Sequence, residues 1–170
     1  ERTAYNNTVA AARLKQWRTR CVSDGYEPGS TFKLVTMAAA LDSGSVTVND
    51  SFYCGGHEDF KGRDQTLSCW KAAGHGAETL EEALGNSCNI AFGHIGLRIG
   101  GEEFYDYINS FGFLEQTGVD LPGEAKGLFF SKADLSGAST ASLISASFGQ
   151  TFRITPIQLV RAVAAIVNGG

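Results

Sequence analysis

A serine and a lysine stand three residues apart at the start of an apolar segment, in Ser30-Thr31-Phe32-Lys33. On a helix this spacing places both side chains on one face, where the hydroxyl and the amine can reach each other. Burial and the positive end of the helix dipole would lower the pKa of the lysine, so that a neutral amine can act as base for a nucleophilic serine. The other interpretation is an N-cap serine followed by a surface lysine, and the local pattern by itself favours it.

A second Ser-x-x-Lys match and a Ser-x-Asn segment bear on that choice. Ser68-Cys69-Trp70-Lys71 has the same spacing, but the surrounding pattern predicts a strand, on which residues three apart point to opposite faces. Ser87-Cys88-Asn89 supplies a second hydroxyl and a carboxamide, which could relay a proton and orient a substrate beside Ser30 and Lys33. Taken alone, Ser87-Cys88-Asn89 is also compatible with a loop turn.

The sequence contains four cysteines, at Cys21, Cys54, Cys69 and Cys88. They suit an exported protein whose thiols oxidise, and we expect a disulfide between Cys54 and Cys69, which flank a predicted hairpin. The alternatives are free thiols and a zinc site formed by Cys54, His57, Cys69 and His75, whose spacing only loosely resembles known zinc patterns. We expect no metal site, and we interpret Cys88 as a packed small residue.

The elements that would position these residues are mostly helical. Apolar periodicity, capping residues and helix-ending glycines predict helices over residues 8–20, 31–41, 90–99, 102–111 and 156–167, and another after the capping box Thr79-Leu80-Glu81-Glu82. Two short aromatic-rich stretches, residues 51–54 and 66–70, are separated by a polar segment containing glycine and predict a small hairpin. The sequence therefore predicts a mostly α fold.

Composition limits the class of protein. The 170 residues, 43% hydrophobic and 19% charged, suit one globular domain with its own core. The net charge of −4 argues against binding to nucleic acid. The longest uncharged apolar run, residues 34–41, is far shorter than the roughly 20 residues that cross a membrane. The chain begins at Glu1 with no export leader, so we expect a piece of a longer protein whose signal or anchor lies elsewhere.

Several separate segments, from about Trp17 to the end, resemble in order those of the class B penicillin-binding proteins, the peptidoglycan D,D-transpeptidases of spore-cortex or division type. The segments that carry the resemblance are Tyr26-Glu27-Pro28-Gly29-Ser30-Thr31-Phe32-Lys33, Asn86-Ser87-Cys88-Asn89-Ile90-Ala91-Phe92, Phe111-Gly112-Phe113, Thr117-Gly118-Val119-Asp120-Leu121-Pro122-Gly123-Glu124, Ser147-Phe148-Gly149-Gln150, Thr155-Pro156-Ile157-Gln158-Leu159 and Asn168-Gly169-Gly170. Because many motifs occur in the right order, the resemblance favours Ser30 as a nucleophile over Ser30 as a cap.

The resemblance implies a serine acyltransferase without cofactors. Ser30 would attack the D-Ala carbonyl of a peptidoglycan stem peptide, Lys33 would act as base, Ser87 would relay a proton, and Asn89 would contact the substrate amide. The backbone N–H of Ser30 would supply half of an oxyanion hole. β-Lactam antibiotics would mimic the donor, and cell-wall synthesis proteins are expected partners. The site would face the outside of the bacterial cytoplasmic membrane.

One expected motif is absent. The family has a Lys-Thr/Ser-Gly strand, and Gln116-Thr117-Gly118 belongs to a different segment. We therefore expect residues 1–170 to be the helical lobe of the β-lactamase/transpeptidase-like α+β fold, cut before that motif, lacking most of the sheet, and inactive or weakly acylated alone. The alternatives are a β-lactamase or D,D-carboxypeptidase relative, and a non-catalytic module that senses β-lactams or docks onto cell-wall machinery.

Overall fold

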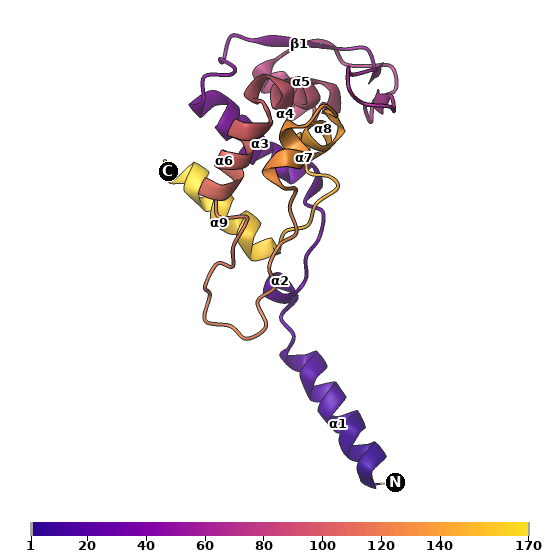
Figure 1. Cartoon of the computed structure of the whole chain (residues 1–170), viewed down its shortest axis with the longest axis vertical. Helices are drawn as coiled ribbons and strands as arrows, with labels where there is room; N and C mark the ends of the chain where they lie inside the picture. Colours follow the sequence, from indigo (N-terminus) through magenta and orange to yellow (C-terminus); the bar gives the residue numbers. More distant parts are fainter. Residues whose placement is uncertain (1, 170) are drawn as a thin grey trace.

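A computed structural model describes residues 2–169 and confirms a mostly helical fold (Figure 1). Glu1 and Gly170, the last residue of the Asn168-Gly169-Gly170 segment, lie outside the described residues. The helices are α1 (Arg2–Trp17), α2 (Arg20–Ser23), α3 (Lys33–Asp42), α4 (Leu80–Gly85), α5 (Asn89–Ile99), α6 (Gly101–Ser110), α7 (Lys132–Ser136), α8 (Ala141–Ser147) and α9 (Pro156–Val167). A 3-10 turn, η1 (Gly29–Phe32), leads into α3, and the strands are β1 (Ser51–Cys54), β2 (His57–Glu58), β3 (Leu67–Ser68) and β4 (Gly76–Thr79).

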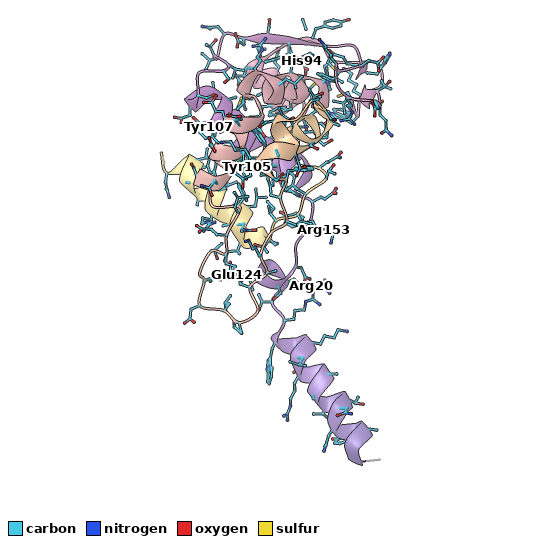
Figure 2. The ribbon with its side chains drawn as sticks, viewed as in Figure 1. Arg20, His94, Tyr105, Tyr107, Glu124 and Arg153 are labelled. Carbon is cyan, nitrogen blue, oxygen red and sulfur yellow. The ribbon has the colours of Figure 1, made fainter. Side chains whose placement is uncertain are left out.

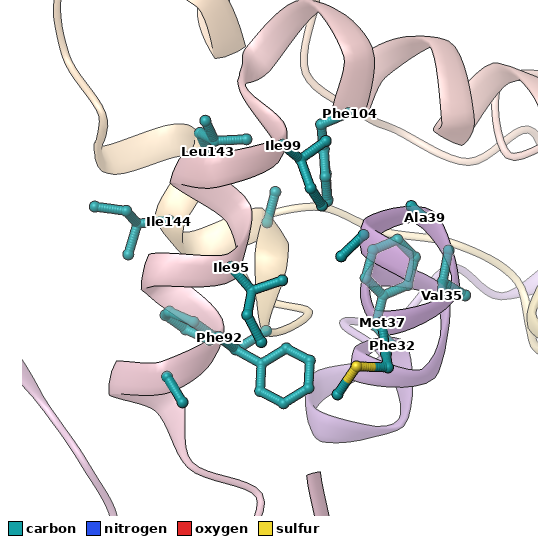
Figure 3. Close-up of a cluster of buried hydrophobic side chains, with 14 of the residues drawn as sticks. Phe32, Val35, Met37, Ala39, Phe92, Ile95, Ile99, Phe104, Leu143 and Ile144 are labelled. Atoms are coloured by element: carbon teal, nitrogen blue, oxygen red, sulfur yellow. The ribbon is translucent and has the colours of Figure 1, made fainter. Parts of the chain in front are cut away.

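Helix α5 lies at the centre of the core and contacts α3, α6, α8 and β1. Its sequence is apolar on nearly every face, as expected for a helix surrounded by other elements. Phe92, Ile95 and Ile99 are buried against residues of α3 and α8 (Figure 3). At Gly96 a Cβ atom would lie 2.6 Å from the Cβ of Ser147, so a glycine there permits the close approach of α5 and α8.

The helices predicted from capping signals are confirmed. Thr79 and Thr155 each form a capping box, and in both cases the hydroxyl accepts a hydrogen bond from the N–H three residues on. The helices predicted over residues 90–99 and 102–111 correspond to α5 and α6. The short helices α7 and α8 were not predicted, although a capping box at Ser131 marks the start of α7.

The first predicted helix has the right type and the wrong limits. Helix α1 begins well before residue 8 and ends at Trp17, and a separate short helix, α2, begins at Arg20. Thr19 has an extended backbone and is the N-cap of α2, so it separates the two. Helix α1 extends away from the rest of the chain (Figure 1), and its residues 4–17 are almost all exposed.

The predicted hairpin is wrong in its pairing. Strand β1 pairs with β4 in an antiparallel ladder that joins Ser51 to Thr79, while β2 pairs with β3. Strand preference indicates that a segment is extended but does not select its partner. Beside this ladder two backbone segments approach closely, since a Cβ atom on Gly74 would lie only 2.2 Å from the carbonyl oxygen of Cys54.

Among residues 2–169, no helix combines the length and apolar character needed to cross a bilayer.

Candidate active site

Ser30 lies in the 3-10 turn η1, and this turn is fixed by contact between two glycines. Gly29 has a positive φ of 57°, and its N–H donates a hydrogen bond of 2.8 Å to the carbonyl oxygen of Gly149. A Cβ atom on Gly149, where φ is 85°, would lie 2.0 Å from the carbonyl oxygen of Gly29. Only glycine at position 149 allows the two backbones to meet, so the segment after α8 sets the position of the Ser30 turn.

The segment before the turn is held by the residues that follow Gly149. Tyr26 and Ile154 exchange backbone hydrogen bonds of 2.9 and 3.0 Å. The ring of Phe32 is fully buried between Phe113 and Phe152, with ring centroids 5.3 and 4.8 Å away. The turn is therefore anchored in the core on one side, while Ser30 itself is exposed.

The Ser-x-Asn segment forms the link between α4 and α5. Ser87 adopts a positive φ of 53°, uncommon for a residue other than glycine, and its N–H donates to the carbonyl oxygen of Leu84. Cys88 is fully buried and is the N-cap of α5, and Asn89 is the first residue of that helix. This sharp turn directs the side chains of Ser87 and Asn89 to the amine of Lys33.

The four predicted site residues meet around the amine of Lys33. Its Nζ lies 2.8 Å from Asn89 Oδ1, 2.9 Å from Ser87 Oγ, 2.8 Å from the carbonyl oxygen of Ser87 and 3.3 Å from Ser30 Oγ. Ser87 Oγ donates to Ser30 Oγ over 2.8 Å. The structure therefore brings Ser30, Lys33, Ser87 and Asn89 into one hydrogen-bonded group.

The environment of Lys33 suits it to proton transfer. The side chain is fully buried, and this burial lowers the pKa of the amine from 10.5 to about 8. A charged amine has three N–H groups for four oxygen neighbours, whereas the neutral amine has two N–H groups and one lone pair. In the neutral form Lys33 can therefore accept a proton, directly from Ser30 or through Ser87.

Two other segments considered from the sequence do not join this group. Ser68 and Lys71 are exposed, and neither bonds to Ser30 or Lys33. Gln116-Thr117-Gly118 is instead held by Glu124, whose carboxylate accepts from the N–H groups of Thr117 and Gly118. Glu124 lies in the long loop between α6 and α7 (Figure 2).

The sequence matches the penicillin-binding protein transpeptidase domain family over residues 1–170. The chain belongs to this family. It is 46% identical to stage V sporulation protein D of Bacillus subtilis over 96% of this chain and 24% of that protein. It is also 32% identical to the peptidoglycan D,D-transpeptidase MrdA of Acinetobacter baumannii, over 89% of this chain and 23% of that protein. The chain therefore spans about a quarter of the length of these relatives.

Solved structures show the same fold. The crystal structure of Pseudomonas aeruginosa PBP2 in complex with WCK 5153 superposes with a TM-score of 0.80 and 28% identity, covering 90% of this chain and 36% of that one. The transpeptidase domain of penicillin-binding protein 3 from Burkholderia pseudomallei gives a TM-score of 0.81 and 27% identity, covering 90% and 44%. The described helices of this chain thus match part of a larger transpeptidase-domain fold.

A second group of polar side chains, three thiols and one imidazole, includes Cys88 of the Ser-x-Asn turn. Cys54 and Cys69 are free thiols, so the disulfide predicted between them is not formed in the structure. Their sulfur atoms, the sulfur atom of Cys88 and a ring nitrogen of His75 all lie within 4.8 Å of one another. The predicted zinc alternative named His57, but His57 is exposed and Cys88 takes the fourth place. Sequence spacing could not show this, because the pairing of β1 with β4 decides which residues converge.

Proposed function

We propose that this chain carries the nucleophile side of a serine D,D-transpeptidase site and forms an acyl-enzyme at Ser30. One observation carries the proposal: the exposed hydroxyl of Ser30, the buried amine of Lys33 and the hydroxyl of Ser87 are joined by contacts of 2.8–3.3 Å. An exposed hydroxyl can reach a large substrate, and a buried amine with a lowered pKa can take its proton.

The proposed acylation moves one proton and exchanges one bond. The neutral amine of Lys33 takes the hydroxyl proton of Ser30, directly or through Ser87, while Ser30 Oγ bonds to the carbonyl carbon of the penultimate D-Ala. The tetrahedral intermediate then expels the terminal D-Ala, whose nitrogen receives the proton. A second amine, from a neighbouring stem peptide, attacks the ester carbonyl, forms the new amide and returns the hydrogen to Ser30 Oγ. A β-lactam would open its ring amide in the first step and keep its leaving nitrogen attached.

Asn89 is the proposed substrate contact. Its Oδ1 accepts a hydrogen bond from Lys33, so this contact fixes the carboxamide with the opposite end, Nδ2, as a donor. A donor beside Ser30 fits the backbone carbonyl groups of a peptide substrate. The amide of Asn89 would therefore orient the stem peptide while its oxygen orients the base.

The whole protein's role is part of the same proposal. Identity of 46% with a sporulation protein, against 32% with MrdA, supports a role in building the spore cortex. We place the site on the outer face of the cytoplasmic membrane, with cell-wall synthesis proteins as partners and an anchor outside these residues. The Lys-Thr/Ser-Gly strand would complete the site from beyond residue 170, and it would bind the substrate carboxylate.

Intact mass spectrometry after exposure to a penicillin tests the proposal. We would compare this chain, its Ser30→Ala variant, a Ser68→Ala control with the serine of the second Ser-x-x-Lys match removed, and a chain extended through a relative's Lys-Thr-Gly strand. We expect a stoichiometric adduct on the extended chain, in its Ser68→Ala form as well, and no adduct with Ser30→Ala.

The possible outcomes distinguish four interpretations of the chain. An adduct on the 170 residues alone shows that the helical lobe is sufficient for acylation. An adduct on the extended chain only shows that the third motif is required. An extended, folded chain that stays unmodified contradicts Ser30 as nucleophile and favours a non-catalytic docking module, and rapid loss of the adduct in water favours a β-lactamase.

A further inference from the structure

Three thiols and one imidazole converge behind the Ser-x-Asn turn. They come from four places in the fold: Cys54 ends β1, Cys69 follows β3, His75 precedes β4, and Cys88 is the N-cap of α5. One candidate ligand atom from each residue lies within 4.8 Å of every other. The three cysteines are buried, and the side chain of His75 is only 3% exposed.

The spacing of these atoms fits the coordination sphere of one small metal ion. Zinc binds thiolate sulfur at about 2.3 Å and imidazole nitrogen at about 2.0 Å in a tetrahedron, which places ligand atoms roughly 3.5–3.8 Å apart. Cys69 Sγ lies 3.8 Å from His75 Nδ1. Three cysteines with one histidine form a donor set used by closed, structural zinc sites, and soft thiolate ligands disfavour magnesium and calcium.

Unpartnered polar atoms beside the thiols also point to a ligand. His75 Nε2 and Glu78 Oε2 are buried and have no hydrogen-bond partner, and the nearest polar neighbours of His75 Nδ1 are a sulfur at 3.8 Å and Glu78 Oε1 at 3.7 Å. A buried ring nitrogen and a buried carboxylate oxygen without hydrogen bonds are costly. A metal bond at Nδ1, the ring nitrogen that faces the thiols, would fix the neutral tautomer that carries its proton on Nε2.

We propose that Cys54, Cys69, His75 and Cys88 bind one Zn²⁺ ion as a structural site. Binding replaces the three thiol protons, which pass to solvent, by three sulfur–zinc bonds. The ion would tie the segment from β1 to β4 to the N-terminus of α5. All four ligand positions are taken by protein, so this zinc would not bind a reacting water.

The zinc would also position the candidate active site, because one ligand lies within the Ser-x-Asn segment. Cys88 is flanked by Ser87 and Asn89, and both of these bond to the amine of Lys33. Ser87 has an unfavourable positive φ that a fixed neighbour can hold. Zinc binding itself does not depend on Ser30 as a nucleophile, so the two proposals can fail separately.

Metal content of the purified chain tests the site. The chain and its variants would be prepared with reductant, incubated with excess Zn²⁺, freed of loose metal by gel filtration and measured by inductively coupled plasma mass spectrometry. We expect about one zinc ion per chain. The zinc content should fall at least about tenfold with Cys69→Ser or His75→Ala. It should not change with Cys21→Ser, which alters the exposed cysteine. Ser30→Ala should keep its zinc.

A second measurement avoids the risk that the ligand variants do not fold. Titration of the unmodified chain with an organomercurial should release zinc in step with modification of the buried thiols, and Co²⁺ should give the strong visible bands of a tetrahedral thiolate site. A reduced chain that retains no zinc, or whose zinc is lost with Cys21→Ser, overturns the proposal. A disulfide between two of the buried thiols in the isolated chain also overturns the proposal, if the chain stays folded after the disulfide is reduced and still binds no metal.

Discussion

The group around Lys33 and the group around Cys69 share one turn but differ in access and in bonding. Lys33 has four oxygen neighbours within 3.3 Å, and the group opens to solvent at Ser30. The thiol group is closed, and a buried nitrogen of His75 has no partner. Proton transfer to a large substrate needs an exposed nucleophile with satisfied partners, whereas a structural metal needs a closed set of donors. The turn Ser87-Cys88-Asn89 serves both by directing alternate side chains to opposite groups.

Replacing Lys33 should have the largest effect, a loss of acylation rate at Ser30, and it should leave the thiol group unchanged. Lys33→Met keeps most of the buried volume and removes the base, so we expect penicillin acylation of the extended chain to slow by about 10²–10⁴-fold. Stopped-flow or timed mass spectrometry measures this rate. Lys71→Met, at an exposed lysine, should leave the rate unchanged. A Lys33→Met variant that acylates at the normal rate contradicts Lys33 as base.

Gly149→Ala should displace the Ser30 turn and leave the thiol group intact. The new Cβ would lie 2.0 Å from the carbonyl oxygen of Gly29 at a positive φ, so we expect a loss of about 2–3 kcal/mol in the free energy of unfolding. Gly85→Ala is the matched control, because no atom lies within 4 Å of a Cβ there. Denaturant titration measures both variants. Equal stability of the two would show that the glycine contact does not constrain the turn.

The pKa of Lys33 predicts a pH dependence for the open group. Because burial lowers this pKa to about 8, acylation should rise about tenfold per pH unit below 8 and level off above it. The folded chain binds fewer protons than the unfolded chain between the folded pKa of about 8 and the ordinary value of 10.5. The contribution of Lys33 to the free energy of unfolding should therefore rise with pH across that window.

Two pH series measure these trends. Timed mass spectrometry across pH 6–9 gives the acylation rate at each pH, and this rate should change about tenfold per pH unit below the pKa of Lys33. Denaturant titration of the chain and of Lys33→Met gives the stability profile, in which only the unmodified chain should show the rise due to Lys33. An acylation rate independent of pH below 8 contradicts the neutral amine as the base.

Thr155→Ala should have the smallest effect and should not distinguish the two groups. Thr155 caps α9 through the N–H of Gln158, and loss of such a cap costs about 1 kcal/mol. Calorimetric melting should detect the loss, while the acylation rate and the zinc content per folded chain should stay as they are. A change in the acylation rate or in the zinc content per folded chain would show that α9 influences one of the two groups directly, and not only the free energy of unfolding.

Local signals predicted much of this molecule. The capping boxes at Thr79 and Thr155 mark helix starts because a hydroxyl and a carboxyl or amide side chain three residues on satisfy the free N–H groups of the first turn. The Ser-x-x-Lys and Ser-x-Asn patterns, with their neighbours in order, predicted which four residues meet around Lys33. The local spacing alone favoured an N-cap serine at Ser30, and the order of several motifs along the chain was needed to group the four residues.

Pairings between distant segments were not predictable in the same way. The sequence predicted that residues 51–54 are extended, but their pairing with β4, and the close approach of Gly74 to the carbonyl of Cys54 beside it, arise only in the folded chain. In the paired arrangement His75 lies beside the thiols of Cys54, Cys69 and Cys88, while His57 is exposed.

The sequence by itself predicted the family and the helical character, and it named Ser30, Lys33, Ser87 and Asn89 as candidate site residues, because residue types at short spacings recur along the chain in the order typical of the family. Only the tertiary structure decided the burial that lowers the pKa of Lys33, the glycine contact that fixes Ser30 and the convergence of three thiols on His75. These depend on which surfaces exclude water from each other and on where backbones approach closely, and both properties arise only when distant segments pack together.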